Sequence, residues 1–387
     1  MADYTSKFSR EQIDALLDKV GSGGGNTGGG DTPSRPAYTG HADIEGLKAI
    51  GWTDEDIEYY QQYGVNWNKE DDEYHKVTDD NKALYGVLTA DNISTYKDRI
   101  VYLPKIDTSG RTSMNNMFQN CYSLVSIPQL NTSGVTDMSS MFSNCYALTS
   151  IPQLDTSNVK DMNNMFYRCS SLVSIPQLDT SSVIVMTDMF NFCHSLVSIP
   201  QLDTSNVTDM SNMFQRCAFL TSIPQLNTSK VTLMSGMFYN CYALVGIPQL
   251  DTSNVTYMTN MFNSCYSLVG IPQLNTSKVT RMNQMFSNCY ALTSIPQLDT
   301  SKVSMIDSMF QNCHHLTTAN LKNVKLAYQL KNSALLSKDS LLYIINNEAA
   351  TSAITITLAS YAYQRLAEDA DIVAALANHP NISLASA

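Results

Sequence analysis

The sequence DTSNVTDMSNMFQRCAFLTSIPQL, residues 203–226, is followed directly by NTSKVTLMSGMFYNCYALVGIPQL, residues 227–250. The pattern that they share, [DN]-T-S-x-V-T-x-M-x-x-M-F-x-x-C-x-x-L-x-x-I-P-Q-L, gives nine 24-residue units over residues 107–322, with the first and last degenerate. Apolar residues fixed at one period predict that each unit is a coil stacked on the next. We therefore expect a leucine-rich-repeat-like α/β solenoid over residues 101–322.

Within one unit, apolar residues fall near every third position, which is neither the period of a strand nor that of a long helix. This spacing predicts a strand in LTSI, an extended VTDM and a short helical or 3₁₀ turn in SNMF. Pro224 lacks an N–H donor, so sheet hydrogen bonds should break there. The side chains expected inside are Val207, Met213, Phe214, Cys217, Leu220 and Ile223.

The nine cysteines lie 24 residues apart, from Cys121 to Cys313. Stacked coils would place them about 4.8 Å apart as a buried ladder. Disulfides are compatible with that separation, but an odd number of equivalent thiols favours none of the pairings. We expect free thiols, and no metal, because no close pair of ligands occurs.

Four segments flank or precede the repeats. Residues 8–20 predict an amphipathic anchoring helix, and the glycine-rich residues 21–40 predict a flexible linker. Residues 41–100 predict a small acidic helical neck, with helices near 52–64, 68–77 and 80–88. Residues 323–387 predict a C-terminal α/β cap of a helix, a strand, a helix pair and a strand. The candidate anchor residues are Phe8, Ile13, Leu16, Leu17 and Val20.

The charge distribution limits the classes of partner. The formal net charge is −11, and residues 41–80 alone hold twelve Asp or Glu against three Lys. Nucleic acid is therefore not an expected partner, because phosphate binding needs clustered Lys and Arg. No run of 18 apolar residues predicts a membrane span, and the start has no signal peptide.

The repeats favour binding over catalysis. Catalysis needs an unsymmetrical group of acid, base or nucleophile, whereas His194, His314 and His315 have no predicted partner. We expect no enzyme activity and no cofactor, and we place recognition at positions that vary between units. The candidate recognition residues are Tyr167, Val185, Phe192, Arg216, Phe219, Leu233, Tyr239 and Tyr257.

A second candidate is an aromatic stripe one residue after the cysteines. It could stack on sugar rings or on protein, or it could only cover the solenoid. Its members are Tyr122, Tyr146, Tyr242, Tyr266 and Tyr290, with His194 and His314 in two gaps.

The units TSNVTDMSNMFQRC and LTSIPQL resemble the BspA-like, Treponema-type leucine-rich repeats of bacterial surface proteins, across all of 107–322. The stretches FSREQIDALLDKV, GWTDEDIEYYQQYGVNW and DDEYHKVTDDNKALYGVLTADNIS look like parts of virion proteins from tailed phages of gut bacteria. The first resemblance implies a right-handed solenoid with a recognition role, and its cell-surface members are exported.

Because a signal peptide is absent, the expectation is a phage virion fibre or appendage, made in the host cytoplasm and displayed on the particle surface. Its helix would bind other virion proteins, and its solenoid a host surface protein, a glycan or a neighbouring virion protein. A homo-oligomer is expected, with a trimer by resemblance to phage fibres. The alternative is a bacterial cell-surface leucine-rich repeat adhesin, and a third reading is a surface-glycan depolymerase.

Overall fold

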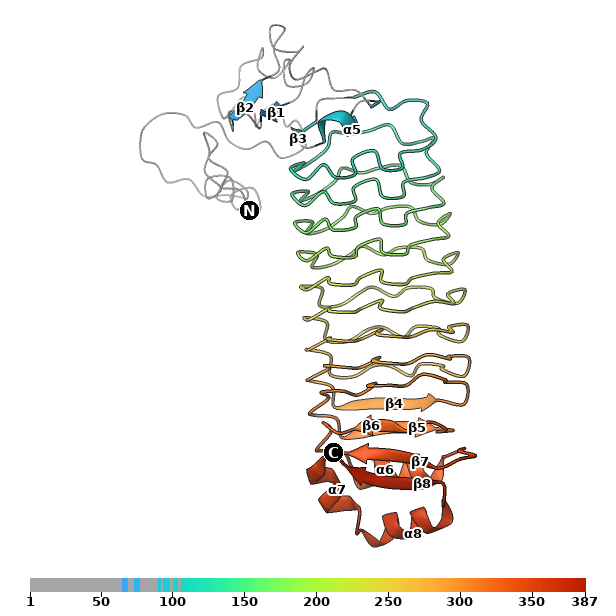
Figure 1. Ribbon diagram of the computed structural model, residues 1–387. Coiled ribbons are helices and arrows are strands. Elements are labelled where there is room, and N and C mark those ends of the chain that lie inside the picture. The colour runs from blue at the N-terminus through green and yellow to red at the C-terminus, as the bar shows by residue number, and fades with distance from the viewer. Residues whose placement is uncertain (1–64, 69–72, 77–89, 92, 98–99, 104–105) are drawn as a thin grey trace.

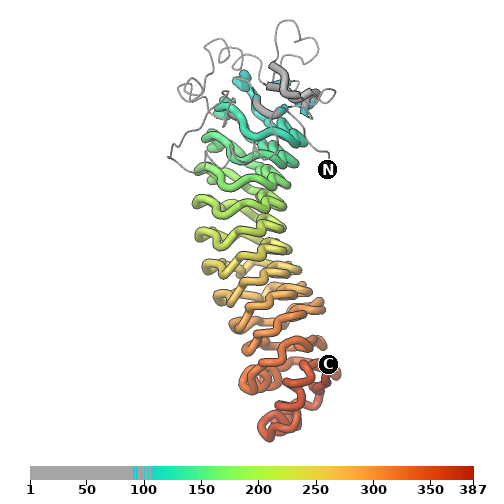
Figure 2. The backbone as a smooth tube through the Cα atoms, turned by 90° about the vertical axis from the view of Figure 1, so that its left-hand side faces the viewer, coloured from blue at the N-terminus to red at the C-terminus, as the bar shows by residue number. Residues whose placement is uncertain are grey.

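The computed structural model describes residues 65–68, 73–76, 90–91, 93–97, 100–103 and 106–387. Between residues 106 and 322 the chain forms one continuous stack of coils (Figure 1), and the view turned by 90° shows the same stack as a slanted, slightly curved column (Figure 2). A row of parallel backbone bridges joins one residue of each coil to the next, from Ser113 to Met305. The predicted repeat solenoid is therefore confirmed.

Part of the N-terminal prediction falls outside the described residues. This holds for the linker at 21–40, for the neck helices near 52–64 and 80–88, and for the anchoring helix. The anchor residues concerned are Phe8, Ile13, Leu16, Leu17 and Val20.

The predicted helix at residues 68–77 is wrong. Strands β1 (Val65–Asn68) and β2 (Glu73–Lys76) pair antiparallel, with Trp67 opposite Tyr74. Strand β3 (Ile100–Tyr102) pairs with the other side of β1, after the one-turn helix α5 (Ile93–Tyr96). The four acidic residues at 70–73 are typical of a solvated helix start, whereas Val, Trp and Tyr in the flanking sequence favour extended backbone.

One long side of each coil is a series of tight turns instead of the predicted helical or 3₁₀ turn. Met213 and Cys217 donate their N–H groups to the carbonyls of Met210 and Phe214. Asn212 and Arg216, each at the third position of such a turn, have φ of 56° and 61°, as a type II turn requires. The intervening N–H groups reach the next coil: Met210 to Leu233, Asn212 to Ser235, Phe214 to Met237 and Arg216 to Tyr239, at 2.7–3.1 Å.

The solenoid core consists of identical side chains stacked along the axis. Val207, Met213, Phe214, Cys217 and Leu220 are fully buried and Ile223 is 7% exposed, as predicted. The phenylalanine rings from Phe118 to Phe310 stack nearly parallel, with centroids 5.4–5.8 Å apart. Offset aromatic stacking thus fills the interior of the solenoid.

The other long side contains the prolines and is held together by glutamine side chains. At the last coil, β4 (Ser294–Asp299) pairs in parallel with β5 (Thr318–Lys322), and the register shifts between Ile295 and Leu298, around Pro296. In this coil the hydrogen bonds break at proline as predicted, and the strand continues beyond it. The predicted strand in LTSI is not formed at residues 220–223. From Gln129 to Gln273, each glutamine amide donates to the backbone carbonyl of the next coil's glutamine, at 2.5–2.6 Å.

All nine cysteines are buried, and none forms a disulfide. Cys217 donates its thiol proton to the carbonyl of Phe190 in the preceding coil, with Sγ and O 3.2 Å apart, and Cys145 does the same to Phe118 at 3.1 Å. Burial raises the pKa of these thiols well above the ordinary value of 9.0, for Cys313 to about 12. The ladder is therefore made of neutral thiols.

The C-terminal segment contains the helices and strands predicted for it, together with one strand that was not predicted, β6 (Tyr328–Leu330), and it packs on the last coil. Strands β6, β7 and β8 form a parallel sheet in that order, and α6 contacts β5. Ser340 of α6 accepts a hydrogen bond from the N–H of Ala319 in β5, at 2.8 Å. The elements are β6 (Tyr328–Leu330), α6 (Lys338–Asn346), β7 (Ile354–Leu358), α7 (Ser360–Leu366), α8 (Ala370–Asn378) and β8 (Ile382–Ser386).

Candidate functional site

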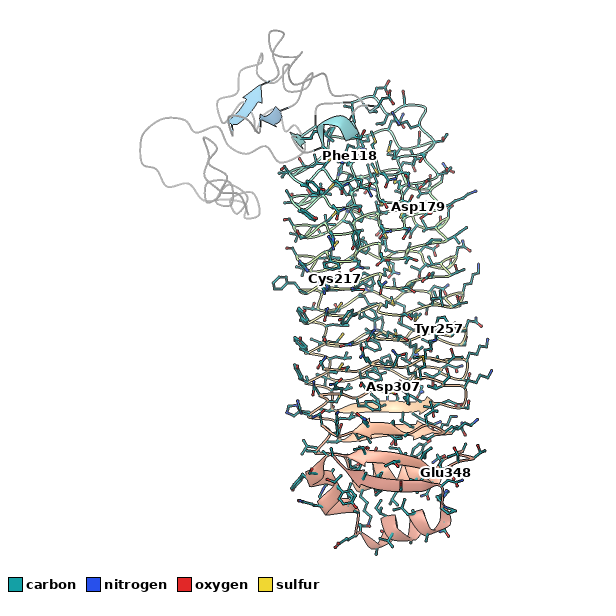
Figure 3. The ribbon with its side chains drawn as sticks, viewed as in Figure 1. Phe118, Asp179, Cys217, Tyr257, Asp307 and Glu348 are labelled. Atoms are coloured by element: carbon teal, nitrogen blue, oxygen red, sulfur yellow. The ribbon has the colours of Figure 1, made fainter. Side chains whose placement is uncertain are left out.

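A groove of about 1500 Å³ runs along the proline side of the solenoid, from Gln153 to Lys322. Its walls repeat the same groups in each coil: glutamine, the aspartate or asparagine after leucine, threonine and serine. In Figure 3, Asp179 lies toward one side of the solenoid and Cys217 toward the other.

The polar groups of the groove already have partners inside the protein. The Gln201 amide donates to Gln225, and the Thr204 hydroxyl donates to the carbonyl of Asn227 at 2.8 Å. Hydrogen bonds from Ser181 lower the pKa of Asp179, and those from Ser205 lower the pKa of Asp203. The groove is therefore a negatively charged, repetitive wall whose donors stabilise the stack.

The side that contains the cysteines differs in composition. We define the cysteine edge as the seven residues that follow the stacked phenylalanine in each coil, for example residues 215–221. Across nine coils it contains no Asp, Glu or Lys, and its only arginines are Arg168 and Arg216. Histidine excepted, charge on this edge is thus restricted to two positions that lie two coils apart.

The predicted aromatic stripe lies on the cysteine edge in two runs. Tyr122 stacks on Tyr146 at 5.3 Å, and Tyr242, Tyr266 and Tyr290 stack in series at 4.8 and 4.9 Å. Each ring is about 40% exposed. Because most ring faces are covered by a neighbouring ring, sugar stacking is possible only at the ends of the runs.

Between the two runs lies a cluster of arginine and aromatic side chains. The guanidinium carbons of Arg168 and Arg216 lie 4.9 and 4.4 Å from the ring centroid of Phe192, one from each neighbouring coil. Tyr167 meets the Phe192 ring edge-on at 6.0 Å, and His194 lies 5.9 Å from it. Phe192 is thus the centre of a cation–π sandwich.

The electrostatics of the cluster keep it cationic. Hydrogen bonds to Tyr146, and more weakly to Tyr167, raise the pKa of Arg168. Burial and the charge of Arg216 lower the pKa of His194, so the imidazole is neutral near pH 7. Among the described residues neither arginine forms an ion pair with a carboxylate.

The structure divides the eight predicted recognition residues between two places. Tyr167, Phe192, Arg216, Phe219 and Tyr239 lie on the cysteine edge, and Phe219 is 62% exposed. The other three are Val185, Leu233 and Tyr257, and they lie in the row of backbone bridges. In that row Val185 is bridged to Asp209, Asp209 to Leu233, and Leu233 to Tyr257.

Sequence reasoning missed Arg168. The signal was present in the column of residues that precede the cysteines: this column is asparagine or serine elsewhere, and Arg168, Phe192 and Arg216 are its three consecutive exceptions.

The part of the chain that the structure describes contains histidines and other possible metal ligands. No group of three or more His, Cys, Asp or Glu side chains there could hold a metal ion. The exposed His315 ring nitrogen lies 2.7 Å from the carbonyl of Tyr290, and His379 faces Glu348 at 3.5 Å. No helix in this part has the length and apolar character needed to cross a membrane.

Three solved structures are similar to this chain over part of its length. A leucine-rich repeat protein of Treponema pallidum is 22% identical over 49% of this chain and 76% of its own, with a TM-score of 0.30. A leucine-rich cell surface protein of Faecalibacterium prausnitzii is 21% identical over 57% and 76%, with a TM-score of 0.29. A leucine-rich repeat protein of Eubacterium ventriosum is 19% identical over 69% and 84%, with a TM-score of 0.36. We take no function from similarities this low.

No curated protein sequence matches the chain significantly. One family model matches it three times in overlapping segments, at residues 91–198, 171–268 and 243–339, which together cover more than half of the chain. The chain therefore belongs to the DUF285 family, whose description is "Mycoplasma protein of unknown function".

Proposed function

We propose that the chain is a non-enzymatic binding protein of a bacterial cell surface, and that its solenoid provides the recognition surface. The observation that carries this proposal is the cysteine edge, where exposed aromatic side chains and two arginines occur without Asp, Glu or Lys. Aromatic and arginine enrichment with depletion of other charges is typical of the centre of a protein interface.

The location rests on the repeats. They make up most of the chain, they match DUF285, and they resemble the BspA-like repeats of bacterial surface proteins. The virion fibre or appendage is the second candidate, favoured by the phage-like motifs of the front segment. Those motifs lie mainly outside the described residues, and the comparisons do not support a phage protein, so the virion reading remains a prediction.

The predicted partners are proposals as well. In the cell-surface reading, the helix at residues 8–20 would dock the chain to an anchoring protein or to copies of itself as an oligomer. In the virion reading, it would bind a structural protein of the particle.

Surface display can be tested with an antibody raised against the solenoid. Intact cells of the bacterium that carries the gene should be labelled, and brief protease treatment of these cells should remove the signal. An antibody against a cytosolic protein of the same cells gives the control for lysis. Labelling only after lysis, with the protein recovered in purified phage particles, would refute the cell-surface proposal and support the virion.

A further inference from the structure

We propose that the cysteine edge around Arg168, Phe192 and Arg216 docks an acidic protein segment, whose carboxylates bind the two arginines and whose apolar side chains pack beside Phe219. This proposal rests on the proposed binding function and specifies the chemistry of its partner.

The first argument is charge complementarity. Arg168 and Arg216 both lie against the ring of Phe192, so their guanidinium carbons are less than about 10 Å apart. Neither has a carboxylate partner among the described residues. Two closely spaced cations on an edge without Asp or Glu favour a partner with acidic side chains.

The second argument is the exposed apolar surface beside the arginines. Phe219 is 62% exposed, and the neighbouring coils add Val197 and Val245, 48% and 54% exposed. An aromatic side chain together with aliphatic ones is suited to the apolar side chains of a protein. This apolar contribution favours an acidic protein segment over an acidic polysaccharide, which has only hydroxyl, carboxyl and ring C–H groups to offer.

The third argument is the conformational strain retained at this place. Phe192, Arg168 and Arg216 have φ of 63°, 60° and 61° in a column where the six remaining coils have asparagine or serine. Asparagine tolerates this left-handed region, and a bulky residue there is uncommon. The equivalent asparagines also bond between coils, as Asn144 does to Asn120 at 2.7 Å. Phe192 has neither the tolerance of positive φ nor the side-chain bond between coils that asparagine provides. Unfavourable backbone conformations of this kind are common at functional sites.

The proposal can be tested with defined polymers and the full chain. The probes are a random glutamate–tyrosine copolymer, poly-L-glutamate, poly-L-lysine and the polyuronate alginate, and binding is measured by biolayer interferometry at low and high salt. We expect the copolymer to bind best, poly-L-glutamate more weakly and poly-L-lysine not at all. High salt should weaken the binding, because the pairs are partly exposed.

Three variants locate the site. The double variant Arg168→Gln/Arg216→Gln should weaken copolymer binding about tenfold. Arg281→Gln is the matched control, since Arg281 lies over Tyr257 in the bridge row; it removes a cation elsewhere and should leave binding unchanged. Phe192→Asn restores the common residue of the column, so it should weaken binding without lowering the unfolding temperature.

The outcomes separate this proposal from the proposed function. Equal effects of Arg281→Gln and the double variant, no binding of the copolymer, or alginate bound as tightly as the copolymer would each overturn the acidic-protein proposal. None of these results would affect surface display on intact cells, which the antibody experiment decides independently.

Discussion

Raising the pH from 7.5 to 9.5 should destabilise the solenoid through its buried thiols. Burial raises the pKa of eight cysteines, from Cys145 to Cys313, above the 9.0 of an exposed thiol. Below pH 9 both the folded and the unfolded chain keep these protons. Above it the unfolded chain loses them while the folded chain does not, so the free energy of unfolding falls as the pH rises toward the folded pKa.

The magnitude follows from the unfolded pKa alone. At pH 9.5, ionisation of one thiol with a pKa of 9.0 lowers the free energy of the unfolded chain by about 0.8 kcal/mol. Eight such thiols together lower it by about 7 kcal/mol. This is comparable to the whole stability of many domains. The loss should therefore appear as a large fall in unfolding temperature, well below the pH at which most lysines titrate.

Thermal unfolding followed by circular dichroism between pH 7.5 and 9.5, in the presence of reductant, measures this effect. Cys217→Ala gives the control within the ladder: it lowers stability at all pH values, but its loss between the two pH values should be smaller by about 0.8 kcal/mol. An unfolding temperature that does not change over this range would refute neutral buried thiols as a feature of the fold.

Three further outcomes test other parts of the structure. Gln225→Ala should lower the free energy of unfolding by about 1 kcal/mol, because the carbonyl of Gln249 loses its amide donor; Gln215→Ala, outside the glutamine ladder, gives the control in urea unfolding. Ser308 has φ of 54°, so Ser308→Val should cost about 1–2 kcal/mol and Ser308→Gly should be tolerated in the same assay. Iodoacetamide should alkylate Cys217 only after unfolding, and masses of the denatured chain with and without reductant should agree; rapid labelling of the native protein would contradict a buried ladder.

The coil period and the core could be read from the sequence because stacking imposes them directly. A residue that faces its own copy in the next coil must be apolar and the same in every unit, as Phe214 and Cys217 are. The elements of the C-terminal segment were also predictable, since each has its own apolar pattern and the helix α6 has a serine N-cap at Ser337.

The tight turns could not be recognised from local spacing. Met210, Met213 and Phe214 lie three and four residues apart, which is also the spacing of one face of a helix. A turn series replaces the helix because its free N–H groups reach carbonyls of the next coil, such as that of Leu233. The carbonyl that accepts each N–H lies in another coil, so it cannot be identified from the local sequence. Asparagine recurs at the two positions of each coil that have positive φ, and this recurrence was a signal for the turns.

The candidate site could be predicted only in part, because its residues are exceptions to the repeat. Phe192 and Arg216 were found as variable positions, but their contact was not, since it joins two coils. The regular tyrosine stripe was compatible with a ligand surface and with a ladder that only covers the solenoid; in the structure the rings stack on one another, and each stays about 40% exposed, so a role in binding stays a prediction.

Regularity and recognition conflict in a solenoid of this kind. A column of identical side chains bonds to itself, as Asn312 does to Asn288 at 2.7 Å, and it offers the same contacts at every coil. A partner that binds one such coil could bind any other, so a regular column cannot define a single position along the axis. Arg168, Phe192 and Arg216 lack the asparagine side-chain amide bond between coils for three consecutive units, and the cation–π contacts in its place offset about 0.5–2 kcal/mol of the loss. The place where the stack is least regular on the cysteine edge is therefore also the place where a partner can be bound in one register.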